Sequence, residues 1–229
     1  MVTNGGNVPQ PPAVLFSAGL DSAVLLASAL TTGTAHPIYV STGLAWEAQE
    51  LAAAARLLAA PLYRSAAPMA TLTVDMRDVY PASHWAVKGE APGFDTPDED
   101  VYLDGRNIVL LAKTSVFMAR NRIERVLLGP LAGNPFPDAT PQFFSAMAHA
   151  LSLGLASPVV VETPLVSMHK AEVIRLGETL GVPFELTLSC MQPAGGEHCG
   201  RCSKCRERRD GFLEAGVEDP TVYRERPVR

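Results

Sequence analysis

The sequence predicts an α/β fold in which helices cover both faces of a parallel sheet, with a small metal-binding segment at the C-terminal end. Short apolar runs alternate with helical patterns along most of the chain, which is typical of a parallel sheet covered by helices. A polar turn containing serine joins the first apolar run to the first helix. All four cysteines of the 229-residue chain lie between Cys190 and Cys205.

The first half of the chain contains three predicted strands and two predicted helices. Ala13–Phe16 is a continuous apolar run after prolines, as expected for a strand buried on both faces. A helix from Asp21 to Ala29 follows, then a strand at His36–Val40. The Ala- and Leu-rich run Glu47–Ala59 predicts a second helix. Leu62–Ser65 is predicted as the third strand.

Residues 68–104 have a different character, with many prolines and acidic residues and little periodicity. A segment of this length inside a compact domain is often a lid or a binding loop. Surface disorder is the alternative, and the composition does not decide between the two.

Strands and helices alternate again in the second half of the chain. We expect helices at 107–119, 141–153 and 170–180, and strands at 125–128 and 159–161. The last helix ends at Gly181, with Pro183 shortly after, which is a typical C-terminal signal. We therefore place the main domain at 13–186 and a C-terminal segment at 187–229.

Composition limits the partners that we expect. Hydrophobic residues make up 47% and charged residues 19%, with a formal net charge of −5, so no basic surface for nucleic acid is indicated. No apolar run approaches the roughly 18 residues of a membrane span. Residues 1–12 are polar and lack the pattern of a signal peptide. We interpret them as a disordered leader and expect a cytoplasmic protein without a membrane partner.

The turn after the first strand has the features of a phosphate-binding loop. A helix N-terminus offers free N–H groups to an anion, and Gly19 allows close approach of the backbone. Ser17 and Ser22 can donate to phosphate oxygens, and Asp21 can orient Mg²⁺ or the loop. The loop ends in neither Gly-Lys-Ser nor Gly-Lys-Thr and lacks the GxGxxG pattern. A serine-capped helix without a ligand is the alternative. The predicted loop consists of Phe16, Ser17, Ala18, Gly19, Leu20, Asp21 and Ser22.

The cysteines follow the pattern C-x8-C-x2-C-x2-C. Four thiolates can surround one Zn²⁺, and such a closed site is structural because it leaves no position for substrate. Disulfides and an iron–sulfur cluster are alternatives. The surrounding cations could balance the thiolate charge or contact nucleic acid, and we favour charge balance. The predicted ligands are Cys190, Cys199, Cys202 and Cys205, and the cations are Arg201, Lys204, Arg206, Arg208 and Arg209.

These motifs together resemble the 7-cyano-7-deazaguanine synthase family (QueC, also called ExsB) of N-type ATP pyrophosphatases, over nearly the whole chain. The loop resembles the family's SGGxDS motif with Ala18 in place of the first glycine, which is tolerable if the φ angle stays negative. Other matches are Gly105-Arg106-Asn107, Pro137-Asp138, Glu162-Thr163-Pro164-Leu165 with Lys170-Ala171-Glu172, and Thr187-Leu188-Ser189-Cys190 with the later cysteines.

Two segments depart from the family pattern. Thr42–Trp46 stands where the family carries YGQ-x-H and keeps only Gly43, and Asp138-Ala139-Thr140 stands where the family has Asp-Cys-Arg. Both segments are expected at the active face. Two alternatives therefore stay open. The first is a QueC-like enzyme that passes a related carboxylate to a protein or nucleic-acid acceptor. The second is a catalytically inactive module that binds ATP and zinc.

The resemblance implies a Rossmann-like (adenine nucleotide alpha hydrolase-like) ATP pyrophosphatase domain at 13–186 and a zinc segment at 187–229. It implies a homodimeric ligase that uses ATP, Mg²⁺ and Zn²⁺. The implied substrates are 7-carboxy-7-deazaguanine, a small 7-deazapurine carboxylate, and ammonia, and the product belongs to queuosine biosynthesis.

Several residues receive expected roles from this resemblance, each with a simpler alternative. Lys170 is expected to neutralise phosphate, or else to be a surface lysine. Arg106 and Asn107 are expected to bind substrate or nucleotide, or else to cap a helix. Asp138 is expected to bind substrate or metal, or else to be a turn residue. Trp46 is expected to stack on a heterocycle, or else to pack in the core or on the surface. The expected catalytic residues are Ser17, Asp21, Ser22 and Lys170.

Overall fold

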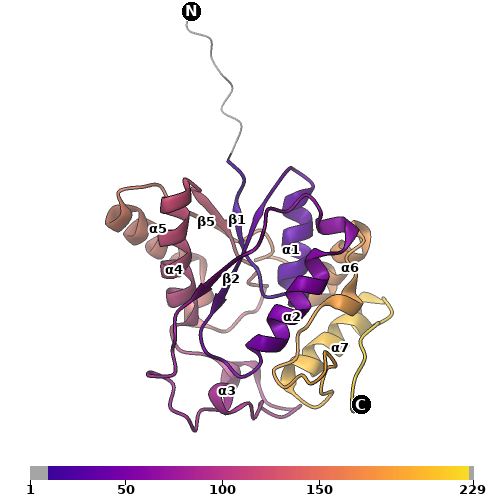
Figure 1. Cartoon of the computed structure of the whole chain (residues 1–229). Coiled ribbons are helices and arrows are strands. Elements are labelled where there is room, and N and C mark those ends of the chain that lie inside the picture. Colours follow the sequence, from indigo (N-terminus) through magenta and orange to yellow (C-terminus); the bar gives the residue numbers. More distant parts are fainter. Residues whose placement is uncertain (1–9, 227–229) are drawn as a thin grey trace, which may run out of the picture.

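The computed structural model describes residues 10–226 and contains one five-stranded sheet (Figure 1). All strand pairs are parallel, in the order β3-β2-β1-β4-β5. This is a Rossmann-like order, in which the chain reverses its direction of travel between β1 and β4 and opens a crevice there. The strands are β1 (Ala13–Leu15), β2 (His36–Ser41), β3 (Ala70–Thr73), β4 (Arg125–Leu127) and β5 (Val160–Glu162). The predicted leader at 1–12 falls mostly outside the described residues.

Seven α-helices occur in the described part of the chain, and short 3-10 turns connect several of them. They are α1 (Leu20–Leu30), α2 (Glu47–Leu58), α3 (Trp85–Lys88), α4 (Arg106–Asn121), α5 (Pro141–Leu155), α6 (Lys170–Leu180) and α7 (Ser203–Ala215). The 3-10 turns are η1 (Pro61–Tyr63), η2 (Asp98–Val101), η3 (Pro137–Ala139) and η4 (Phe184–Leu186). Within residues 10–226 we find no helix of the length and apolarity needed to cross a membrane.

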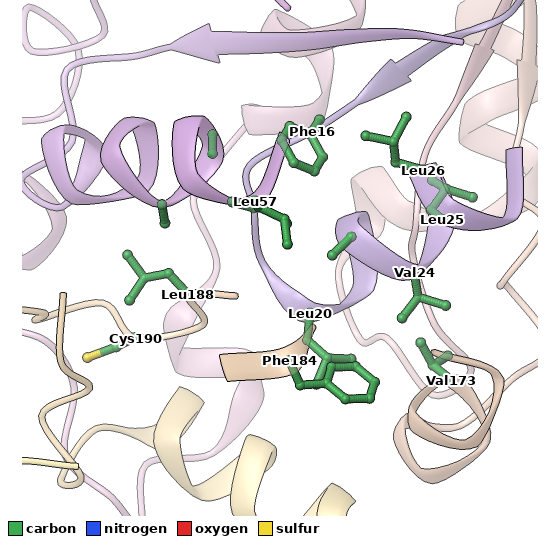
Figure 2. Close-up of a cluster of buried hydrophobic side chains, with 14 of the residues drawn as sticks. Phe16, Leu20, Val24, Leu25, Leu26, Leu57, Val173, Phe184, Leu188 and Cys190 are labelled. Atoms are coloured by element: carbon green, nitrogen blue, oxygen red, sulfur yellow. The ribbon is translucent and has the colours of Figure 1, made fainter. Parts of the chain in front are cut away.

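Two apolar cores lie on opposite faces of the sheet, as the strand pattern requires. Successive side chains of a strand point to opposite faces, so Val14 and Phe16 join one core while Ala13 joins the other. The first core is covered by α1, α2, α6 and α7 and the second by α4 and α5 (Figure 1). Figure 2 shows Leu188 and Cys190 of the C-terminal segment in the same buried cluster as Phe16. The predicted parallel sheet with helices on both faces is confirmed.

The third strand was predicted at the wrong place. Leu62–Ser65 overlaps the 3-10 turn η1, which begins at Pro61 and buries Tyr63, whose hydroxyl donates to the carbonyl of Ala23 at 3.1 Å. The apolar residues of this stretch therefore pack as a turn on α1. The true third strand, β3, lies at the sheet edge with alternate residues exposed, so its hydrophobic signal is weak.

The segment at 68–104 contains β3, α3 and η2. Three of its residues, Trp85, Val101 and Leu103, line a cavity at the carboxyl edge of the sheet. Tyr80 ties the middle of the segment to its end before α4, because its hydroxyl donates to the carbonyl of Asp104 at 2.8 Å. The described geometry favours the interpretation as a binding loop over surface disorder.

Candidate functional site

The loop between β1 and α1 is held by its own two serines. Ser17 Oγ accepts from the N–H of Gly19 at 3.3 Å, and Ser22 Oγ donates to the carbonyl of Gly19 at 3.0 Å. Ser22 Oγ also accepts from the N–H of Ser17 at 3.3 Å. Gly19 is the N-cap of α1 and provides no side-chain cap, so N–H groups of the first helical turn remain for an anion.

Ala18 adopts the left-handed conformation, with φ of 60°. Alanine would replace glycine at this position without cost only if φ were negative. The left-handed conformation therefore strains the backbone at Ala18 by about 1–2 kcal/mol. Two features hold the residue in place: it is fully buried, and its carbonyl accepts from the N–H of Leu188 at 2.8 Å. The C-terminal segment thus fixes the shape of the loop.

Lys170 lies beside the loop and not on the open surface. Its Nζ donates to Asp21 Oδ1 at 2.8 Å and Oδ2 at 2.7 Å, and it lies 2.7 Å from Glu207 Oε1. Lys204 completes the chain of alternating charges at 2.6 Å from Glu207 Oε2. Burial alone would lower the pKa of Lys170, but Asp21 and Glu207 outweigh it and raise that pKa above its ordinary value. The ammonium group is therefore permanently charged and joins α1, α6 and α7.

Asp138 caps helix α4 from a neighbouring turn. Its Oδ2 accepts from the N–H of Asn107 at 2.9 Å, and the amide of Asn107 donates to the carbonyl of Asp138 at 2.9 Å. The N-cap residue itself is Gly105, at φ of 72°, so Asn107 is not the N-cap. Burial raises the pKa of Asp138, opposed by the hydrogen bonds from Asn107. These two residues shape the cavity wall, and Arg106 beside them has a buried Nε without a hydrogen-bond partner in the described part of the chain.

Two cavities meet at the loop between β1 and α1. The first, of about 310 Å³, lies at the carboxyl ends of β1, β2 and β4, where open α/β sheets bind their ligands. The second, of about 270 Å³, lies between the loop and the C-terminal segment. Their shared wall consists of Ser17, Gly19, Asp21, Glu50, Val101, Leu103, Arg106 and Phe136.

Trp46 is buried and is stacked on another tryptophan. Its ring centroid lies 5.7 Å from that of Trp85, with an interplanar angle of 13°. Both rings line the second cavity, so Trp46 combines core packing with a wall position.

Two glutamates of α2 were not identified from the sequence. Glu47 Oε1 accepts from the N–H of Thr42 at 2.6 Å, and its Oε2 accepts from the N–H of Gly43 at 3.2 Å. Glu50 Oε2 accepts from the hydroxyl of Tyr39 at 2.7 Å, inside the shared wall. The available signal was their spacing of three residues, which puts both on one face of a helix that follows a buried strand. Glu47 thereby fixes the segment that departs from the family motif.

The four cysteine sulfurs converge on one point. They all lie within 4.8 Å of one another, and individual Sγ–Sγ distances are 4.0 Å for Cys190–Cys202, 3.8 Å for Cys199–Cys205 and 3.5 Å for Cys202–Cys205. A tetrahedral ion with Zn–S bonds of ~2.3 Å places its ligands ~3.8 Å apart, so the set fits Zn²⁺. The distances far exceed the ~2.05 Å of a disulfide, and all four thiols are free.

Gly200 and Arg208 secure this centre. Gly200 has φ of 80°, and a Cβ atom there would lie 1.6 Å from the carbonyl oxygen of Glu225, so only glycine fits the turn. Arg208 is 2% exposed and donates to the carbonyl of Phe184 at 2.9 Å and to Thr187 Oγ1 at 2.7 Å. It also lies 3.7 Å from Asp219. From the sequence we favoured charge balance over nucleic-acid contact for this arginine, whereas in the fold it is a buried structural link.

The fold and the site define a Rossmann-like α/β protein with a polar cleft at the carboxyl edge of its sheet and a four-cysteine centre beside that cleft. The family model described as "Queuosine biosynthesis protein QueC" matches residues 12–216. The chain belongs to this QueC family, so the resemblance seen in the sequence is confirmed.

Curated relatives match nearly the whole chain. The 7-cyano-7-deazaguanine synthase of Anaeromyxobacter dehalogenans (strain 2CP-C) is 35% identical over 224 residues, covering 92% of this chain and 94% of the relative. The protein of that name from Thermoplasma volcanium is 32% identical over 232 residues, covering 96% of this chain and 93% of the relative.

Proposed function

We propose that this chain is an ATP-dependent ligase that converts 7-carboxy-7-deazaguanine and ammonia into 7-cyano-7-deazaguanine, in the cytoplasm, for queuosine biosynthesis. Relatives that match nearly its whole length carry the name of that synthase, which supports the choice of substrate. The observation that carries the proposal is the pair of cavities that share the phosphate loop. A ligase of this type must hold a nucleotide and an acid side by side.

The chemistry requires activation of a carboxylate, because oxide is a poor leaving group. Transfer of AMP from ATP to the carboxylate breaks the bond between the α- and β-phosphates and releases pyrophosphate. Ammonia attacks the carbonyl carbon, AMP leaves, and one proton is released with the amide. A second activation at the amide oxygen lets that oxygen depart with AMP and gives the nitrile and a further proton.

The protein contributes mainly positioning and charge stabilisation to these steps. The nucleotide would occupy the first cavity, with its phosphates on Ser17, Gly19 and Ser22. The planar acid would occupy the second cavity beside Trp46, with its carboxylate directed at the loop. Lys170 would act through Asp21, which it holds by two hydrogen bonds.

Two metal ions complete the proposal. The four cysteines would hold Zn²⁺, which closes the C-terminal segment and leaves no open position for substrate. Asp21 would contribute to Mg²⁺ binding, and the phosphates would supply most of the oxygen ligands. A homodimer is part of the proposal and would appear in the sedimentation of the purified protein.

The test is a product assay by mass spectrometry with ATP, Mg²⁺, 7-carboxy-7-deazaguanine and ammonium. We expect the mass of the amide or nitrile, lost in Ser17→Ala and Asp21→Asn and retained in Asp78→Asn, a control at an exposed aspartate. Acyl adenylate that accumulates without amide would indicate a different acceptor. Consumption of neither ATP nor the deazapurine, beside an active synthase, would refute the proposal.

A further inference from the structure

Glu50 is a buried carboxylate that faces both cavities. It is 8% exposed and lines the shared wall. Its Oε2 accepts from Tyr39 at 2.7 Å, and no Lys, Arg or His nitrogen of residues 10–226 lies within ion-pair distance. Burial raises the pKa of Glu50 to about 7. The side chain of Trp46 also hydrogen-bonds to this carboxylate. A carboxylate offers about four acceptor positions, so Glu50 still has capacity for donors from a ligand.

Arg106 supplies the complementary group. It is the first residue of α4 and lines the same two cavities. Its positive charge acts on Glu50 and lowers the pKa of that carboxyl, against the larger effect of burial. Its Nε is buried, and the described residues provide no acceptor for it. A donor that lacks an acceptor and a carboxylate that can accept more bonds therefore face one space.

The stacked rings of Trp46 and Trp85 line the second cavity together with Glu50 and Arg106. Trp46 immediately precedes α2, the helix that carries Glu50. A flat ring that enters this cavity would therefore meet aromatic surface and an acceptor–donor pair in the same place.

We propose that Glu50 and Arg106 together read the amide edge of a guanine-type ring, with Arg106 donating to the ring carbonyl and Glu50 accepting from the ring N–H and the exocyclic amine. A guanine-type edge presents one acceptor next to two donors, whereas an adenine-type edge presents a donor next to a bare nitrogen. The pair would bind the first edge and reject the second. Ring N–H donors would also favour the charged carboxylate and so reduce the cost of its burial. This inference rests on the proposed function and names the part of the substrate that sets specificity.

The test compares 7-carboxy-7-deazaguanine with its analogue that lacks the 2-amino group, using pyrophosphate exchange to follow activation. For the intact protein we expect kcat/KM to favour the full substrate by roughly 10- to 100-fold. Glu50→Gln should reduce that ratio to below about threefold and raise KM more than it lowers kcat, because the contact is remote from the reacting carboxylate. Glu178→Gln, at an exposed position of α6, is the matched control and should retain the ratio.

Two further measurements separate the possible failures. ATP affinity, measured by calorimetry, should be the same in Glu50→Gln and in the intact protein; a parallel loss would assign Glu50 to the nucleotide and overturn the inference. An unchanged substrate ratio in Glu50→Gln would overturn it as well. If the intact protein activates neither acid, the proposed function fails. In that case the edge contact is judged by calorimetric binding of 7-cyano-7-deazaguanine: affinity that depends on Glu50 supports it, and absent or independent binding refutes it.

Discussion

Replacement of Arg208 by methionine should destabilise the protein strongly. The guanidinium is 2% exposed and makes hydrogen bonds to Phe184, Thr187, Ser189 and Thr221. It joins η4, the segment before the first cysteine and the C-terminal end of the described chain. Burial lowers the pKa of Arg208, opposed by Asp219, yet an arginine remains charged because its ordinary pKa is so high.

The expected loss follows from the groups that the substitution leaves behind. Methionine fills much of the volume but leaves Asp219 without its cation. It also removes all four hydrogen bonds, three of which are short: 2.5 Å to Thr221, 2.7 Å to Thr187 and 2.9 Å to Phe184. Hydrogen bonds to a charged group are worth about 1.5–3 kcal/mol each, and removal of one partner of a buried pair costs about 3–5 kcal/mol. We therefore expect a loss of about 3–5 kcal/mol in the free energy of unfolding.

The assay is urea denaturation followed by circular dichroism, at saturating zinc and pH 7. Arg224→Met is the control, because Arg224 is exposed and its side chain makes one hydrogen bond within the described residues, to the carbonyl of Gln192 at 2.8 Å. This substitution should cost less than ~1 kcal/mol. The double variant Arg208→Met with Asp219→Asn should recover part of the loss. Equal, small losses in Arg208→Met and Arg224→Met would refute the argument that the buried guanidinium holds the segment.

Three other predictions concern packing, pH and metal. Gly177→Ala should lower the free energy of unfolding by about 1–3 kcal/mol, because the added Cβ would lie 2.5 Å from Phe184 Cζ. Gly154→Ala has open space around the added Cβ and should raise that free energy by ~0.5–1 kcal/mol. Thermal denaturation measures both, and a change of the same sign in the two variants would contradict this account. Burial raises the pKa of Glu50 from 4.5 to about 7, so between these values the folded state holds a proton that the unfolded state has lost. Folding stability should therefore fall as pH rises through that window, by up to ~3 kcal/mol. Glu50→Gln should flatten the profile of stability against pH between pH 5 and 7, and an unchanged slope would count against the raised pKa. The purified protein should contain one zinc and no iron per chain, with four unreactive thiols that become reactive to a thiol reagent on chelation; an iron signal or reactive thiols before chelation would refute the zinc site.

Much of the fold could be predicted because its signals are local. The strand at 13–16 and the helix ending at Gly181 depend on apolar runs and end signals within a few residues. The cysteine cluster was equally visible, since its ligands come in a fixed spacing. The third strand was missed because an edge strand with alternate exposed residues carries half the apolar signal of a buried one.

The parts of the site that could not be predicted depend on contacts between distant residues. Asp138 binds Asn107 across 31 positions and Lys170 binds Asp21 across 149, and neither partner could be chosen from spacing. Arg208 is one of five cations of similar sequence context, and only its packing distinguishes it from the other four, which are partly buried or exposed. Glu50 has the sequence context of an ordinary acidic residue in the first turn of a helix. Only its burial in the folded chain distinguishes it.

The contacts around the loop between β1 and α1 argue that the four-cysteine segment is more than an attachment. Leu188 donates to the carbonyl of the strained Ala18, and Glu207 of α7 shares Lys170 with Asp21. The proposed domain boundary between residues 186 and 187 therefore separates the loop that would bind phosphate from the cysteines that would bind metal. Both parts nevertheless share one apolar core. If the segment loosened, Ala18 would lose a hydrogen bond that holds its left-handed conformation, and Lys170 would lose one of its two carboxylates. The proposed metal centre would thereby set the geometry of the loop that we propose binds phosphate.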